Sequence, residues 1–178
     1  MVTTLQKLID RLETFVELVG RLAAWLVLGL VLLVAFNVLA RYMFSAGTVA
    51  LQELEWHMLA VTALIGMSYG INRGDEVRVD MLYAGYSSRT KAVVDILSAV
   101  LMLLVALFII KVSIGYVQQS YAYNEGSPDP GGLPYRFILK ALIPIGFFLL
   151  ALQSVAQIAK AIRAYKQASS TTDQPPAL

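Results

Sequence analysis

The sequence predicts an all-α membrane protein with four transmembrane helices, and three observations lead to this fold class. Hydrophobic residues make up 58% of the 178 residues and charged residues 15%, whereas soluble domains average about 45–50% and about 25%. The mean hydropathy is +0.67. The apolar residues form continuous runs, unlike the alternating pattern of barrel strands. We therefore expect one transmembrane domain over residues 1–166, followed by a disordered polar tail over residues 167–178.

The first expected element is an amphipathic helix over residues 4–20. At 100° per residue, its apolar side chains fall within about 120° of one another. They are Leu5, Leu8, Ile9, Leu12, Phe15, Val16 and Val19. The other side carries Lys7, Asp10, Arg11, Glu13, Thr14 and Glu17. This pattern favours a helix that lies on membrane lipids at the cytoplasmic interface. The alternative is a helix packed on a partner or on the middle loop.

Four spans follow, since a helix needs about 20 apolar residues to cross a hydrocarbon core of about 30 Å. The expected spans are residues 22–40, 56–72, 92–117 and 137–159. The first apolar run is too long for a cleaved signal peptide, so we interpret it as a retained anchor. Pro144 lies near the start of the last span and is expected to kink it.

The distribution of basic residues predicts the orientation of these spans. Ten lysines and arginines lie on one side: Lys7, Arg11, Arg21, Arg73, Arg78, Arg89, Lys91, Lys160, Arg163 and Lys166. The two opposite loops hold Arg41 and Arg136, with Lys111 and Lys140 at the adjoining helix ends. The positive-inside rule therefore places both termini and the middle loop in the cytoplasm. An outer aromatic belt is then expected from Tyr42, Phe44, Trp56, Tyr116, Tyr121, Tyr123 and Tyr135.

The chemistry that the chain lacks excludes several classes of function. There is no cysteine and one histidine, His57, so disulfides, cysteine-ligated metals and a haem between two histidines of this chain are excluded. The net charge of +2 is too small to indicate nucleic-acid binding. Every charge lies at or near a span end, which leaves no carboxylate at mid-membrane for ion coupling. We expect no catalytic, cofactor or metal site, and a satisfied or solvated His57 rather than a ligand or pH switch.

Polar residues instead gather where the first span ends and the second begins. Asn37 and Arg41 are four residues apart and share a helix face, and Glu53 and Glu55 precede the second span. One interpretation is an ion pair between Arg41 and a glutamate across the short loop. In the other, Arg41 extends to the lipid headgroups and the glutamates stabilise the positive end of the second helix.

Small residues mark a packing face on the second span. Thr62, Gly66 and Gly70 recur every four residues, which lets another helix approach closely. Whether that helix belongs to this chain or to a partner is left open by the sequence.

A dense charge cluster follows the second span at residues 73–80, RGDEVRVD. It is interpreted as a docking or folding motif, carried by Arg73, Gly74, Val77, Arg78 and Asp80. A solvated loop with arginines at the headgroups is one alternative. A metal-dependent enzyme using Asp75, Glu76 and Asp80 is another, but nothing else on that side supplies a substrate pocket.

Four sequence features together resemble one family. They are residues 36–44 (FNVLARYMF), residues 53–56 (ELEW), the 73–80 cluster, and Ser127-Pro128 with Leu133-Pro134 and residues 143–146 (IPIG). Over about residues 15–160 the chain resembles the small membrane subunit (the Q-type small permease) of tripartite ATP-independent periplasmic (TRAP) transporters. The 73–80 cluster is the most specific of these features.

The resemblance implies a function that composition could not supply. It implies a non-enzymatic scaffold subunit of a sodium-coupled secondary importer in the bacterial inner membrane. The implied partners are a large, elevator-type, multi-span membrane subunit and a periplasmic solute-binding protein, and the solute is usually an organic acid. The main alternative is a self-contained four-span channel or homo-oligomeric pore, which should show a polar stripe along one span. A membrane enzyme is a third reading.

Overall fold

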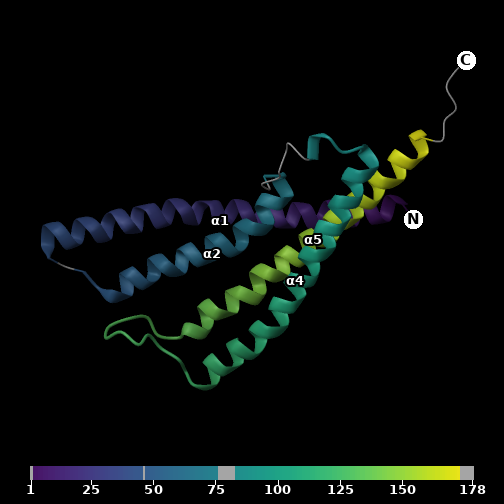
Figure 1. The fold of residues 1–178 in the computed structure, drawn as a ribbon. Coiled ribbons are helices and arrows are strands. Elements are labelled where there is room, and N and C mark those ends of the chain that lie inside the picture. Colours follow the sequence, from purple (N-terminus) through teal and green to yellow (C-terminus); the bar gives the residue numbers. More distant parts are fainter. Residues whose placement is uncertain (1, 46, 76–82, 173–178) are drawn as a thin grey trace, which may run out of the picture.

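The computed structural model describes residues 2–45, 47–75 and 83–172. Their regular secondary structure is α-helical, and four helices are defined: α1 (Val2–Phe44), α2 (Val49–Arg73), α4 (Ser88–Ala122) and α5 (Arg136–Thr172). Figure 1 shows that α1 and α2 form one hairpin and that α4 and α5 form a second. The predicted all-α fold is confirmed.

Three of these helices are long and apolar enough to cross a membrane: Ile9–Phe44, Ser88–Ala122 and Arg136–Ser169. Helix α2 does not meet the same measure, because glutamates, His57 and Asn72 lower its hydropathy. Its 25 residues still extend about 37 Å at 1.5 Å per residue. The second span at residues 56–72 therefore stays a prediction.

The N-terminal segment differs from expectation, because residues 4–20 and 22–40 belong to one unbroken helix, α1. Its buried side chains Ile9, Val16 and Ala23 recur every seven residues and face the rest of the chain. A Cβ atom at Gly20 would clash with the ring of Tyr69 on α2, so a residue that often breaks helices is here a close-packing position. The segment packs within the chain, and its place at a membrane interface stays a prediction.

The C-terminal boundary also lies later than expected. Helix α5 continues to Thr172, so residues 167–172, which we expected to be disordered, extend the last helix. The rest of the expected tail, residues 173–178, lies outside the described residues.

Helices α4 and α5 pack through a row of small side chains. The buried residues of α4 recur every seven positions: Ala92, Ala99, Ala106, Ser113 and Ser120. Such a heptad spacing keeps one stripe of a helix facing its neighbour along its whole length, and small residues let the two backbones approach. Ala106 forms a buried cluster with Leu150 and Ala151 of α5. This hairpin is therefore held by close helix contact.

The two hairpins meet where α5 lies against α2 and α1. At Gly146 of α5, a Cβ atom would lie 2.8 Å from Cβ of Leu64 and 3.1 Å from its carbonyl oxygen. Further along, Gln157 Nε2 donates to the carbonyl oxygen of Ile71 at 3.2 Å. These contacts define an interface between α2 and α5, which we call the α2–α5 seam.

Candidate functional site

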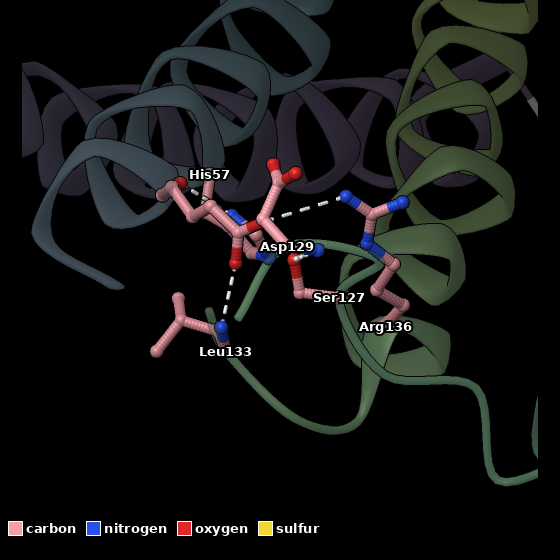
Figure 2. A network of polar contacts seen from close by, with 6 residues as sticks. His57, Ser127, Asp129, Leu133 and Arg136 are labelled. Carbon is pink, nitrogen blue, oxygen red and sulfur yellow. Dashed lines mark hydrogen bonds and ion pairs between the residues drawn. The ribbon is translucent and has the colours of Figure 1, made fainter. Parts of the chain in front are cut away.

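The most connected polar site surrounds Glu53 at the start of α2, and we call it the Glu53 network. The Glu53 side chain is only 12% exposed. Its carboxylate accepts hydrogen bonds from the Ser127 hydroxyl, from the Leu133 backbone N–H at 2.6 Å and from Arg136 Nη2 at 3.5 Å. Figure 2 shows these groups converging from the α4–α5 loop and the first turn of α5. One carboxylate thus ties the first hairpin to the second.

The loop that delivers these donors is shaped by its own sequence. Residues 124–135 carry three prolines, which prevent a regular helix. A Cβ atom at Gly132 would clash with Ser127 and lie 2.8 Å from Glu53 Oε2, so a glycine lets the loop close over the carboxylate. Ser127 also accepts a hydrogen bond from the Asp129 backbone N–H at 3.1 Å. The loop is therefore folded around Glu53.

His57 completes the network one helical turn after Glu53. Its Nδ1 lies 2.6 Å from the backbone carbonyl oxygen of Glu53. A carbonyl oxygen only accepts, so Nδ1 carries the proton and donates. His57 is therefore a satisfied residue in this structure, in agreement with the sequence interpretation.

A second acid–base pair closes the base of the same loop. Lys140 on α5 pairs with Glu125, just after α4, and its Nζ lies 4.0 Å from the centre of the Tyr116 ring. The Arg136 backbone N–H donates to the carbonyl oxygen of Glu125 at 2.8 Å. Both ends of the α4–α5 loop are thus held in place.

Hydrogen bonds and nearby charges keep Glu53 and Glu125 ionised. Both residues lie outside the expected spans. Hydrogen bonds from Ser127 and then Leu133 lower the pKa of Glu53, with a smaller contribution from the charge of Arg136. The hydrogen bond from Lys140 lowers the pKa of Glu125. Each carboxylate is stabilised by donors that only the folded chain supplies.

Acidification is therefore expected to weaken this loop. A carboxyl whose pKa is lower in the folded state stabilises the protein fully above its unfolded pKa, and that stability is lost as the pH falls toward the folded pKa. We expect the Tm in lipid nanodiscs to fall once the pH drops below the ordinary value of 4.5. A double variant, Glu53→Gln with Glu125→Gln, should show a flatter dependence. An equal slope in both proteins would contradict this assignment.

Asn37, Arg41 and Glu55, which the sequence grouped with Glu53, do not join the Glu53 network. Asn37 on α1 is 8% exposed, and its Nδ2 donates to Glu55 Oε1 at 2.9 Å. Arg41 is exposed and forms no ion pair with either glutamate in the described part of the chain. Of the two interpretations, the Arg41–glutamate pair is thus not formed. The N-terminal cap of α2 is Thr48, whose Oγ1 accepts from the Leu51 N–H at 3.3 Å.

Among the described residues, no other helix approaches the two glycines of the expected packing face on α2 closely. A Cβ atom at Gly66 or Gly70 would meet no atom within 4 Å. Thr62 donates to the carbonyl oxygen of Met58 in its own helix at 2.9 Å. Contact of this face with a partner stays a prediction. Pro144 lies within α5, two residues before the close approach at Gly146.

Two glycine substitutions should therefore have opposite effects. Gly146→Ala must displace Leu64, including its backbone, and is expected to destabilise the chain by about 1–2 kcal/mol. Gly66→Ala places a methyl group in open space and replaces a poor helix former, so it should stabilise the isolated chain by up to about 1 kcal/mol. Unfolding of both variants in nanodiscs tests this. Equal effects would mean that the α2–α5 seam is not packed as described.

At the other end of α2, the start of the 73–80 cluster has a structural role. Gly74 ends the helix with φ +76°, and the Asp75 N–H donates to the Gly70 carbonyl oxygen at 3.0 Å. A positive φ favours glycine, and this bond pattern satisfies the last carbonyls of the helix. Arg73 Nη1 lies 3.6 Å from Glu17 Oε1 of α1. Val77, Arg78 and Asp80 lie outside the described residues.

A second polar cluster, the Glu13 cluster, surrounds this helix end. Glu13 of α1 pairs with Lys160 of α5, and its backbone carbonyl oxygen accepts from Asn72 Nδ2 at 3.1 Å. Glu17 pairs with Arg73 and, at 2.7 Å, with Arg21. Three helices are therefore joined at the opposite end from the Glu53 network.

The sequence interpretation missed the partners of Glu53. Ser127 and Leu133 entered only as parts of the family resemblance, and Arg136, Glu125 and Lys140 were not singled out as a site. The available signal was the glycine- and proline-rich loop with charged residues at both ends. Among the described residues, no group of three or more histidines, cysteines or acids could hold a metal ion. The arrangement joins helices through hydrogen bonds and ion pairs.

A comparison with family models finds one that matches residues 30–164, described as "Tripartite ATP-independent periplasmic transporters, DctQ component". The match covers the end of α1, all of α2 and α4, and most of α5, which is more than half of the chain. It includes the Glu53 network. A comparison with curated proteins finds no match.

Proposed function

The chain belongs to the family of DctQ components, the small membrane components of tripartite ATP-independent periplasmic transporters, and on this premise we propose that it is a non-catalytic scaffold subunit. It braces the large elevator-type membrane subunit of a sodium-coupled secondary importer. The importer takes its solute, which for such transporters is usually an organic acid, from a periplasmic solute-binding protein. The family match over residues 30–164 carries this proposal.

The bracing role is supported by the way the two hairpins are joined. The Glu53 network links them at one end, and the Glu13 cluster links them at the other. The α2–α5 seam lies between these two sites. Two hairpins held together at three places along their length resist bending when the large subunit moves against them.

Exposed apolar faces on α1 and α4 provide the surfaces for lipid and for the large subunit. On α1 the exposed side chains include Leu22, Trp25, Leu28, Leu32, Phe36 and Leu39. On α4 they include Leu97, Leu101, Leu104 and Phe108. Apolar surface of this extent needs a hydrocarbon or protein neighbour. In this proposal α2 also crosses the membrane, as the second of four spans, and packs against α1 and α5. Residues 1–166 then act as one domain.

The orientation follows from the basic residues. With both termini in the cytoplasm of a bacterial inner-membrane protein, the α4–α5 loop and the Glu53 network face the periplasm. Tyr121, Tyr123 and Tyr135 are exposed there, as an aromatic belt requires. A loop held by Glu53 and Lys140 gives the binding protein a surface of constant shape, so we include docking in the proposal.

Transport in proteoliposomes tests this function. Sodium-driven uptake is measured with the large subunit and the binding protein, with and without this chain, and with this chain alone. We expect uptake only when this chain and the large subunit are both present. Uptake or an ion leak from this chain alone would overturn the scaffold proposal and favour a pore.

A further inference from the structure

The α2–α5 seam contains a buried amide that its own helices leave without a partner. Gln153 of α5 is 0% exposed, and neither its Nε2 nor its Oε1 has a hydrogen-bond partner in the part of the chain that the structure describes. An unpaired buried polar group costs about 1–3 kcal/mol. Inside a bilayer no bulk water offers the missing bonds. This amide therefore requires an explanation.

The position of Gln153 on α5 shows which neighbour it faces. Gly146 and Gln157 both contact α2. At 100° per residue, Gln153 lies about 20° from Gly146 and about 40° from Gln157 around the helix. It therefore shares the α2-facing side of α5, between these two contacts.

Ser68 is the matching group on α2. It is 0% exposed. At 100° per residue it lies about 40° from Leu64 and about 60° from Ile71, which contact α5, and about 40° on its other side from Asn72, which contacts α1. Ser68 therefore lies at the edge of the α5-facing side of α2. Its hydroxyl donates to the Ile65 carbonyl oxygen at 2.9 Å, which leaves the Oγ lone pairs available as acceptors. Two buried polar groups thus occupy the same stretch of the seam.

We propose that the α2–α5 seam binds one internal water molecule between Gln153 and Ser68. The water accepts a hydrogen bond from Gln153 Nε2, donates one to Oε1 of the same amide and donates its second hydrogen to Ser68 Oγ. Buried waters typically make about three hydrogen bonds; here two would go to the unpaired amide of Gln153 and one to the free lone pair of Ser68 Oγ. The site joins the two hairpins inside the membrane, where the Glu53 network and the Glu13 cluster do not reach.

The direction in which Gln153→Leu changes the Tm tests the proposal. In the full chain in lipid nanodiscs, Gln153→Leu should lower the Tm by about 3 °C, because it removes the water-mediated link. If the amide were simply unpaired, the same change would remove a buried penalty and hold or raise the Tm, which would overturn the proposal. Gln118→Leu, at an exposed position on α4, controls for the added leucine.

Two further measurements make the result specific. The double variant Ser68→Ala with Gln153→Leu should be no less stable than Gln153→Leu alone, because the single substitution already removes the water site. If the losses of the two single variants add, the two side chains do not share one water. The Tm should be the same in sodium and potassium chloride, and a sodium-specific increase would replace the water with a cation. If Gln153→Leu does not fold, a high-resolution structure of the wild-type transporter complex decides. Density for a water between the two side chains supports the proposal, and their direct contact rejects it.

Discussion

Replacing Glu53 with alanine is expected to lower the Tm of the chain by roughly 5–10 °C. The variant loses the hydrogen bonds from Ser127, Leu133 and Arg136 in one step. It also leaves the Leu133 N–H and the Arg136 guanidinium without their acceptor, and an unpaired donor costs more than a lost bond. Thermal unfolding of the full chain in lipid nanodiscs measures the loss.

Glu55→Gln is the matched control for this prediction. The two glutamates are two residues apart on α2, but Glu55 accepts one bond, from Asn37, and a glutamine oxygen can still accept it. We expect a Tm change below about 2 °C. If both variants unfold at the same temperature, the α4–α5 loop is not held by Glu53. In the proteoliposome assay, Glu53→Ala should also reduce uptake more than Glu55→Gln does.

The different partners of these glutamates follow from helix geometry that is visible in the sequence. Residues two apart on a helix point about 200° from each other, so Glu53 and Glu55 cannot share a partner. Glu55 points to Asn37 on α1, and Glu53 points to the loop and α5. The sequence placed the polar residues at this end of the helices. It could not show which loop reaches them, because Ser127 and Arg136 are more than 70 residues away along the chain.

The fold class was predictable because each long apolar run must be helical in a bilayer. The boundaries were less predictable, because they depend on contacts. The segments 4–20 and 22–40 form one helix, in which Glu13, Glu17 and Gly20 contact α2 and α5. These partners on α2 and α5 lie far away along the chain. The sequence pointed to Gly66 and Gly70 as close-packing positions. The close approaches within this chain occur instead at Gly20, against Tyr69, and at Gly146, against Leu64.

One packing signal was present in the sequence and was overlooked. Ala92, Ala99, Ala106, Ser113 and Ser120 recur every seven residues within an otherwise bulky apolar run. In a span that is hydrophobic on all sides, hydrophobicity does not reveal the buried face, whereas side-chain size does. This row correctly identifies the face of α4 that meets α5, and it can be tested directly.

Ala106→Leu is expected to destabilise the chain by about 3 kcal/mol. Ala106 is 0% exposed and lies in a cluster with Leu150 and Ala151, so the added carbons must force α4 and α5 apart. The neighbouring exposed change Val105→Leu should alter stability by less than about 0.5 kcal/mol. Unfolding of both variants in nanodiscs provides the comparison.

A compensating substitution separates overpacking from a general effect of leucine in α4. Leu150→Ala alone should cost about 2–5 kcal/mol through the cavity that it leaves. In the double variant with Ala106→Leu, the new leucine fills most of the volume that Leu150→Ala removes from the same cluster. Exchanges that conserve volume are tolerated best. The double variant should therefore be more stable than the sum of the two single losses predicts. Strict additivity would show that the two side chains do not share one packing site, and the α4–α5 interface would then not follow the seven-residue row.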